Sequence, residues 1–494
     1  MSRITLFLIV ASVFVSYCLS SPSPCHELAS LLPGKVFFPG SNSYTLSVTF
    51  YYFRQQRELD PICIVAPSSV EDVSIAVKRL AELPDLTFAI RSGGHSPSLG
   101  AANAPNGITI DLRSLDTIQV DGSIVSVGGG VLWQDVYDAL VPHGLVAVGA
   151  REGTVGTGGF LTGGGISAFS PNRGFACDNI KNVEVVLASG EIVNTNSTHN
   201  ADLFAKLKGG QNNFGIVTRF DLSTFPQSDY WGGMIQYPSS IDEAQLKAFS
   251  AFKNSPFDPQ AVVIQSFIFN SSPDPASRYA SVNNLFYTEP IANPSALGMF
   301  TEVQPQLYSS LRISNLSDFT HELSASQSTD QYSVYATTTF RSSEAFLHQV
   351  HALWRSFTNK EDLSKIPDLR SVLTIQSIPP VIPSSPNTLG FPADSHPETD
   401  LILLLASSYW SDSAYSKVVE SHTRTLIEEI EALAKHEDVD HPFRYMNYAA
   451  AWQDVIAGYG EQSVKELWEV SKEYDPLGVF QEKVPGGFKL PKQR

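Results

Sequence analysis

The sequence lacks a dense cluster of Lys and Arg. Its formal net charge at pH 7 is -17, because 50 Asp and Glu residues outnumber 33 Lys and Arg residues. Such a chain repels a phosphate backbone, and nucleic-acid binding needs a concentrated basic surface. We therefore expect no nucleic acid among the partners.

The apolar run at the N-terminus is too short to cross a bilayer. Residues 4–15 are apolar, Arg3 precedes them, and Cys18, Leu19 and Ser20 follow. A membrane anchor needs about 20 apolar residues, whereas this shorter pattern is typical of a signal peptide. We expect residues 1–20 to be removed by cleavage near Ser20, the mature chain to be secreted, and no stable association with a membrane.

Cysteine is scarce, with 4 residues in the whole chain. Loss of Cys18 with the signal peptide leaves an odd number in an oxidising compartment, namely Cys25, Cys63 and Cys177. One disulfide and one buried free thiol are the simplest interpretation. Three Asn-x-Ser/Thr triplets are compatible with glycosylation after export, at Asn196, Asn270 and Asn315.

Several catalytic signatures are missing. The sequence contains no Gly-x4-Gly-Lys-Ser/Thr phosphate loop, no His-Glu-x-x-His zinc helix, no Cys-x-x-Cys pair and no Gly-x-Ser-x-Gly elbow. A nicotinamide fingerprint also fails, because Leu161 stands where a third glycine would follow Gly156 and Gly158. These absences argue against common hydrolases, NTPases and Rossmann dehydrogenases, and we expect no metal site.

Strand and helix patterns predict an α+β fold. At 494 residues the chain is too long for one ordinary core, so two lobes are expected, with a boundary near Pro226. A capping box at residues 68–71 predicts the start of one helix. The other expected elements are strands at 62–65, 87–90, 108–112, 124–127 and 215–220, a hairpin at 183–193, a buried strand at 401–406, and helices at 133–140, 343–357, 416–434 and 463–470.

Three glycine clusters lie at the ends of expected strands, at residues 91–96, 128–130 and 153–165. Glycine makes tight turns, and that alone would explain any one of them. Backbone N–H groups can approach a pyrophosphate only where side chains are absent, and an acidic chain must bind phosphate through such dipoles. The three clusters together therefore favour a large dianionic ligand.

These motifs resemble the berberine-bridge-enzyme-like flavoproteins, a family within the vanillyl-alcohol-oxidase group that shares a PCMH-type FAD-binding domain. The resemblance covers about residues 60–225 and 445–488. It rests on Arg-Ser-Gly-Gly-His-Ser at 91–96, Thr-Val-Gly-Thr-Gly-Gly at 154–159, Gly-Gly-Gly at 163–165, Cys-Asp-Asn at 177–179 and Lys-Gly-Gly-x-Asn-Asn-Phe-Gly-Ile-Val at 208–217.

The resemblance implies a division of the chain. An N-terminal arm at 21–57 would precede a two-lobed PCMH-type FAD-binding domain at 58–227. A substrate-binding domain at 228–441 would contain an antiparallel sheet covered by helices. The segment 442–494 would return to the FAD domain.

The resemblance also implies the cofactor site. His95 would form the 8α-histidyl bond to FAD, and an imidazole is a competent nucleophile for that bond. The alternative is a histidine kept at the turn for hydrogen bonding. The other implied cofactor-binding residues are Arg91, Ser92, Gly93, Gly94, Ser96, Gly153, Thr154, Val155, Gly156, Gly158, Gly159, Gly163, Gly165, Ile216, Val217 and Asn447.

One position departs from the family's pattern. Many members carry a second linkage through a Cys three residues before the Val-Gly pair, where this sequence has Glu152. A carboxylate cannot form the thioether, so we predict a single covalent bond. Cys177 aligns with a structural position after the glycine tract, and we expect Cys25 to pair with Cys63.

Tyr448 resembles the position that serves some carbohydrate-oxidising relatives as catalytic base. The alternative is an aromatic residue that packs a strand, in which Asn447 would point to the opposite face. The expected function is transfer of a hydride from a secondary-metabolite intermediate, alcohol or sugar to FAD, with dioxygen as electron acceptor. A flavin-holding binding protein without turnover is the competing hypothesis.

Overall fold

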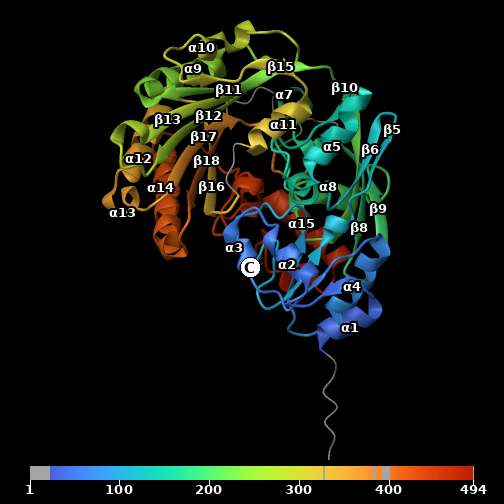
Figure 1. Ribbon diagram of the computed structural model, residues 1–494. Helices are drawn as coiled ribbons and strands as arrows, with labels where there is room; N and C mark the ends of the chain where they lie inside the picture. Colours follow the sequence, from blue (N-terminus) through green and yellow to red (C-terminus); the bar gives the residue numbers. More distant parts are fainter. Residues whose placement is uncertain (1–22, 326–328, 381, 383–384, 392–400, 493–494) are drawn as a thin grey trace, which may run out of the picture.

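The computed structural model describes residues 23–492 except 326–328, 381, 383–384 and 392–400. The expected signal peptide lies outside the described residues. The fold is α+β, as expected, and its strands form three sheets (Figure 1). Among the helices that the structure describes, none combines the length and the apolar character that a membrane span requires.

The first sheet has four short strands next to the N-terminal helices. Its order is β1 (Val36–Phe37), β2 (Cys63–Val65), β4 (Ile108–Asp111) and β3 (Phe88–Arg91). Strands β2, β4 and β3 are parallel, and helices α1 (Pro24–Leu31) and α4 (Val70–Glu82) contribute to its core. Strand β3 ends at Arg91, so the 91–96 turn starts at the carboxyl end of a parallel strand.

The capping box of α4 differs from the expected one by a single residue. The Ser69 hydroxyl accepts a hydrogen bond from the Asp72 backbone N–H, and the Asp72 carboxylate accepts one from the Ser69 backbone N–H. The expectation of a box at 68–71 was therefore wrong. Two consecutive serines each have an acidic residue three positions later, so the sequence pattern fits either register.

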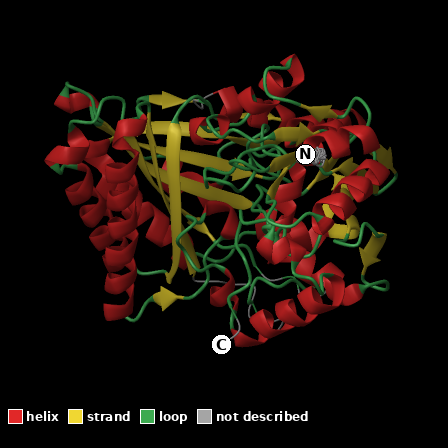
Figure 2. Ribbon diagram, turned by 90° about the horizontal axis from the view of Figure 1, so that it is seen from below, coloured by secondary structure: helices red, strands yellow, loops and turns green. Residues whose placement is uncertain are grey.

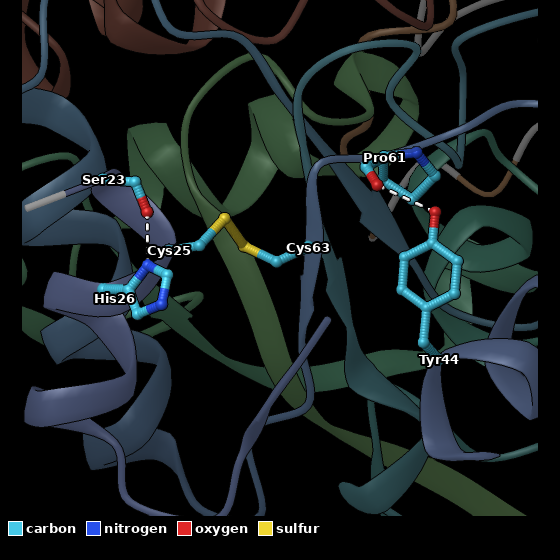
Figure 3. The surroundings of a disulfide bond; sticks show 6 residues. All are labelled: Ser23, Cys25, His26, Tyr44, Pro61 and Cys63. Carbon is cyan, nitrogen blue, oxygen red and sulfur yellow. Dashed lines mark hydrogen bonds between the residues drawn. A yellow bond between two sulfur atoms is a disulfide. The ribbon is translucent and has the colours of Figure 1, made fainter. Parts of the chain in front are cut away.

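The disulfide between Cys25 and Cys63 is confirmed (Figure 3). It joins α1 to β2 across 38 residues of sequence. Cys177 is a buried free thiol, and burial raises its pKa well above the ordinary value. Beside the disulfide, the Tyr44 hydroxyl donates a hydrogen bond of 2.8 Å to the Pro61 carbonyl.

The second sheet is six-stranded and antiparallel. Its order is β5 (Ile118–Asp121), β6 (Ile124–Gly128), β10 (Ile216–Pro226), β8 (Ile180–Val186) and β9 (Ile192–Asn196), and β7 (Leu145–Ala147) pairs with the end of β10. Helices α5 (Trp133–Leu140) and α6 (Thr157–Thr162) belong to the same lobe. The expected helix at 133–140 has the observed bounds.

The third sheet has nine strands and begins after β10. Its order is β14 (Tyr308–Ser309), β11 (Tyr230–Pro238), β13 (Tyr279–Tyr287), β12 (Ala261–Asn270), β17 (Arg370–Ser377), β18 (Leu401–Trp410), β16 (Tyr332–Arg341) and β19 (Asp440–His441), with β15 (Arg312–Ser314) paired to β11. Helices α9 (Asp242–Asn254), α12 (Glu344–Thr358) and α14 (Ser416–His436) cover one face, as Figures 1 and 2 show. An antiparallel sheet covered by helices was the expected architecture.

The two faces of this sheet belong to different cores. In β18, Ile402, Leu404 and Ala406 pack beneath the helices, whereas Leu401 and Leu403 join the core of the first lobe. Side chains alternate across a strand, so a strand buried on both faces is apolar throughout. The face of the nine-stranded sheet that the helices leave uncovered therefore packs against the first lobe.

The chain returns to the first lobe at its end. Helix α15 (Glu461–Tyr474) packs against α8 (Ala201–Gly210), and α16 (Val479–Glu482) contributes Phe480 to the core of the four-stranded sheet. The expected helix at 463–470 lies within α15.

Candidate active site

A cavity of about 540 Å³ lies between the lobes. Loops of the first lobe at residues 92–102 and 150–166 form one wall. Strands β12, β13, β16, β17 and β18 contribute the opposite wall, and residues 445–451 and 485–488 of the C-terminal segment also line it. Three separate parts of the chain thus meet at one cavity.

Thirteen of the sequence-predicted residues line this cavity. They are Ser92, Gly93, Gly94, His95, Ser96, Val155, Gly156, Gly158, Gly159, Ile216, Val217, Asn447 and Tyr448. These residues come from four regions of the sequence, at 92–96, 155–159, 216–217 and 447–448, and the structure brings them together.

Glycines allow the two cavity loops to touch. A Cβ on Gly93 would lie 2.4 Å from the Gly156 backbone nitrogen, and one on Gly156 would lie 2.2 Å from the Gly93 nitrogen. The Gly158 N–H donates to the Ser92 hydroxyl at 3.1 Å. A Cβ on Gly159 would meet no atom within 4 Å, so this residue presents bare backbone to open space. Such a wall fits a phosphate-containing cofactor, because side chains would fill the space that the ligand needs.

The remaining predicted glycines act by packing. Gly153, Gly163 and Gly165 are absent from the cavity lining. Added Cβ atoms there would meet Gln134 at 2.5 Å, Asn447 at 2.0 Å and Phe160 at 2.6 Å, respectively. For these three, close contact between neighbouring segments explains the glycine.

Arg91 lies behind the turn and does not line the cavity. Its side chain is fully buried, its guanidinium lies 3.8 Å from the centre of the Tyr51 ring, and its Nη1 donates to the Ser47 carbonyl at 2.5 Å. Asp111 Oδ2 lies 3.5 Å from the same nitrogen. The Arg91 side chain therefore forms no part of the cavity wall, and a role of the 91–96 turn in binding the pyrophosphate stays a prediction. Arg91 holds the 91–96 loop against the N-terminal arm.

His95 faces a carboxylate and a hydroxyl. Its Nε2 lies 3.1 Å from Glu152 Oε2 and 3.1 Å from Thr154 Oγ1. Its ring contacts the Tyr52 ring, with a centroid distance of 3.8 Å and an angle of 35° between the ring planes. Thr154 does not line the cavity, and its hydroxyl also donates to Glu152. The imidazole is thereby fixed in plane and direction.

Glu152 is a carboxylate in this setting. Burial alone would raise its pKa, but the hydrogen bond and charge of His95, with hydrogen bonds from Ser324 and Thr154, lower the pKa to about 2. The Thr154 backbone N–H also donates to Glu152 Oε2 at 3.1 Å.

Tyr448 lies in a 3-10 helix, η8 (Met446–Tyr448), and not in the strand that the packing alternative assumed. The expected opposition of Asn447 and Tyr448 across a strand was wrong, since both line the cavity. The Tyr448 hydroxyl accepts a hydrogen bond of 2.8 Å from Arg151 Nη2. Asn447 donates to the Phe160 carbonyl and to the Tyr445 hydroxyl, each at 3.1 Å.

Sequence reasoning missed Arg151. Its Nη1 donates to Gln376 Oε1 at 2.6 Å, so one guanidinium joins the first lobe, the nine-stranded sheet and the C-terminal segment. The sequence shows that Arg151 precedes Glu152. It does not show the hydrogen-bond partners of Arg151, because these are 225 and 297 residues away along the chain.

The nine-stranded sheet supplies a mixed wall that the sequence analysis left open. The hydroxyls of Tyr335 and Tyr409 lie 2.8 Å apart, and those of Ser266 and Thr374 also lie 2.8 Å apart. Asn284, Ile264, Leu405, Leu323 and Tyr52 complete this part of the lining. Within the described residues, no group of three or more His, Cys, Asp and Glu gathers in a way that could hold a metal ion.

Comparison with known proteins identifies the class of protein to which this cavity belongs. The family described as FAD binding domain matches residues 61–196. The FAD-dependent monooxygenase drtC of Aspergillus calidoustus is 34% identical over 478 residues, covering 94% of this chain and 89% of the relative.

Two solved structures share the fold. The glucooligosaccharide oxidase of Acremonium strictum, described as carrying 6-S-cysteinyl, 8α-N1-histidyl FAD, matches with a TM-score of 0.76 and 18% identity over 96% of this chain and 100% of that one. A variant of berberine bridge enzyme matches with a TM-score of 0.74 and 15% identity over 95% of this chain and 100% of the other.

The fold and the glycine-lined cavity define an FAD-dependent oxidoreductase with a PCMH-type cofactor domain. The chain belongs to the family of FAD-dependent enzymes that includes drtC, and it shares the fold of berberine bridge enzyme.

Proposed function

We propose that this protein oxidises a small organic molecule, with FAD attached to His95 and with Tyr448 as the proton acceptor. The observation that carries the proposal is the 2.8 Å hydrogen bond from Arg151 to the Tyr448 hydroxyl, in the cavity that His95 also lines. The attachment site and the base would thus share one cavity.

The residues that would hold FAD are the glycine loops around Gly93, Gly156 and Gly159, together with Ile216 and Val217. Bound FAD supplies a hydride acceptor. His95 offers an imidazole nitrogen on the same wall, and the similar solved oxidase is described as histidyl-linked. Glu152 cannot add a thioether, so the link at His95 would be the single covalent bond.

Tyr448 would take a proton from the substrate while a hydride leaves the adjacent carbon. A neutral phenol is a poor base. The Arg151 guanidinium donates to its oxygen and brings a positive charge beside it, which stabilises negative charge on that oxygen. Gln376 holds the guanidinium in place through its other terminal nitrogen.

The substrate would enter against the nine-stranded sheet. The hydroxyls of Tyr335, Tyr409, Ser266 and Thr374 and the apolar side chains of Ile264 and Leu405 suit a molecule with both hydroxyl groups and apolar surface. An alcohol, a sugar or a secondary-metabolite intermediate fits this description. Dioxygen would be the final electron acceptor.

The first test is a substrate panel with purified holoprotein. Alcohols, oligosaccharides and phenolic metabolites are mixed anaerobically with the yellow protein, and bleaching of the flavin absorbance is recorded. Bleaching by any compound supports turnover. A protein that holds FAD without catalysis would bleach with none.

For an active compound, ¹⁸O₂ labelling separates an oxidase, which yields labelled peroxide, from a monooxygenase, which yields labelled product.

Tyr448→Phe tests the proton acceptor. We expect flavin reduction in anaerobic stopped flow to slow by about 100-fold or more, the scale of general-base loss, with FAD content unchanged. Near-normal reduction would make Tyr448 a packing residue and contradict the mechanism.

Export through the secretory pathway belongs to the same proposal. The pattern of residues 1–20 supports it, and N-terminal sequencing of the protein recovered from the medium tests it. Recovery of uncleaved protein only from cells would contradict it.

A further inference from the structure

We propose that Glu152 is a positioning residue for the covalent attachment of FAD: it holds the proton of His95 on Nε2, which leaves Nδ1 as the attacking atom. This inference rests on the proposed link at His95. It assigns a role to the residue that stands where many similar proteins have a second anchor.

The geometry selects one nitrogen of the ring. Glu152 Oε2 and Thr154 Oγ1 both lie 3.1 Å from His95 Nε2. Among the residues that the structure describes, none makes a hydrogen bond to Nδ1. The Tyr52 ring contacts the imidazole at a centroid distance of 3.8 Å, so rotation of the imidazole would disturb this contact.

The chemistry of the partner sets the position of the proton. An ionised carboxylate only accepts hydrogen bonds, and the nitrogen that faces it must therefore donate. Glu152 is 15% exposed, and the hydrogen bonds that it accepts from His95, Ser324 and Thr154 hold its pKa below the ordinary value, so it is ionised at neutral pH. Thr154 donates to the same carboxylate from its backbone and its hydroxyl.

The attachment step balances with dioxygen as oxidant. His95 Nδ1 forms a bond to the 8α carbon of FAD, and one C–H bond of that methyl group breaks. The imidazole acquires positive charge, which Glu152 stabilises, and then releases its Nε2 proton. Two electrons and two protons pass to dioxygen and give hydrogen peroxide. A histidine oriented and stabilised by a carboxylate is a general arrangement for nucleophilic catalysis.

The experiment follows attachment rather than turnover. Full-length chain is produced under riboflavin limitation, mixed with FAD in air, and sampled over time. Flavin that survives acid precipitation gives the linked fraction, and the mass of the His95 peptide confirms it. We expect Glu152→Gln to bind FAD but to link it about 10-fold or more slowly than wild type, and Glu152→Asp to recover most of the rate.

Controls separate this role from a structural one. Glu191→Gln makes the same substitution at an exposed residue outside the cavity and should link FAD at the wild-type rate. Wild-type rates in Glu152→Gln would overturn the proposal, as would equal losses in the Gln and Asp variants or failure of Glu152→Gln to bind FAD. Fragmentation of the flavin peptide should locate the bond at Nδ1, and a bond at Nε2 would also overturn it.

His95→Ala distinguishes the two levels of inference. Covalent FAD in His95→Ala would contradict the proposed link itself. Loss of covalent FAD in His95→Ala, together with normal attachment in Glu152→Gln, would leave that link standing and reject only the role of Glu152.

Discussion

Arg151 has hydrogen-bond partners that its sequence position does not predict, and these partners connect three parts of the cavity wall. It donates to Tyr448 and to Gln376, and both acceptors come from other parts of the fold. A lysine is a point charge with no planar fork, so it can replace the charge but not both directed hydrogen bonds.

Substitution of Arg151 should therefore reveal how much of the reaction depends on that charge. We expect Arg151→Met to slow flavin reduction by about 10- to 100-fold and Arg151→Lys to lose less, with covalent FAD retained in both. Anaerobic stopped flow with an active compound measures the rates. Equal rates in wild type and Arg151→Met would mean that Tyr448 needs no positive neighbour.

Residue 152 should also accept a cysteinyl anchor of the kind described for the glucooligosaccharide oxidase. Its side chain reaches His95, so a cysteine there would lie beside the proposed attachment point. We expect the double variant His95→Ala, Glu152→Cys to retain flavin after acid precipitation, whereas His95→Ala alone releases it. Colourless pellets from both would show that position 152 is not equivalent to the anchor position of similar proteins.

At the scale of elements, the contact between the turn at 91–96 and the start of α6 depends on missing side chains. An added methyl group on Gly156 would clash with the Gly93 backbone, and one on Gly159 would clash with nothing. We expect Gly156→Ala to lower the free energy of unfolding by about 1–3 kcal/mol. Gly159→Ala should leave the stability of the apoprotein unchanged or slightly higher, because alanine favours a helix.

The same pair also tests the cofactor wall. Gly159 lines the cavity, so its alanine variant should bind FAD more weakly although its fold is intact. Urea unfolding of apoprotein and FAD titration separate the two effects. Full FAD affinity in Gly159→Ala would mean that this backbone does not approach the cofactor.

The Asp178 carboxyl, which follows the glycine tract, makes the stability of the fold depend on pH. Burial raises its pKa to about 6 from 3.8, despite hydrogen bonds from Asn387 and from the Phe175 backbone. The folded state then binds the proton more strongly than the unfolded state. Its contribution to stability is present below about pH 4 and is lost as pH rises through about 6.

Asp178→Asn removes this titration. The difference in unfolding free energy between wild type and Asp178→Asn should fall by at most about 3 kcal/mol between pH 4 and pH 7. Urea unfolding at several pH values measures it. A difference that is constant over this range, or that grows with pH, would contradict the raised pKa.

The sequence predicted helices and strands better than it predicted contacts between residues far apart in the chain. Strand β18 and helix α5 were found because an apolar run and a helical period are local signals. The capping box moved by one residue since Ser68 and Ser69 fit the motif equally. The helical turn at 446–448 was missed because aromatic residues are common in strands, and the packing of Asn447 against Gly163 is a long-range contact.

At the scale of the whole molecule, the cavity belongs to no single lobe. The N-terminal arm crosses the boundary: Gln55 donates to the carbonyls of Pro97 in the first lobe and Ser333 in β16. Arg54 and Arg57 pair with Asp330 at 2.7 and 3.2 Å, although Asp330 is 62% exposed, and such pairs contribute little to stability. The arm therefore aligns the two walls chiefly through the buried Phe53 ring, which contacts His95 of the first lobe and Tyr335 of β16.

The disulfide attaches that arm to the four-stranded sheet, and neither of its cysteines lines the cavity. In the chain-entropy model, closing a loop across 38 residues stabilises the fold by about 4 kcal/mol. We expect the double variant Cys25→Ala, Cys63→Ala to lose stability on this scale in urea unfolding while its covalent FAD content stays normal. Cys177→Ala, which removes the buried free thiol, is the matched control and should leave the mapped disulfide intact. Equal stability of the double variant and wild type, or non-reducing peptide maps with Cys177 in the bridge, would show that the arm is held by packing alone.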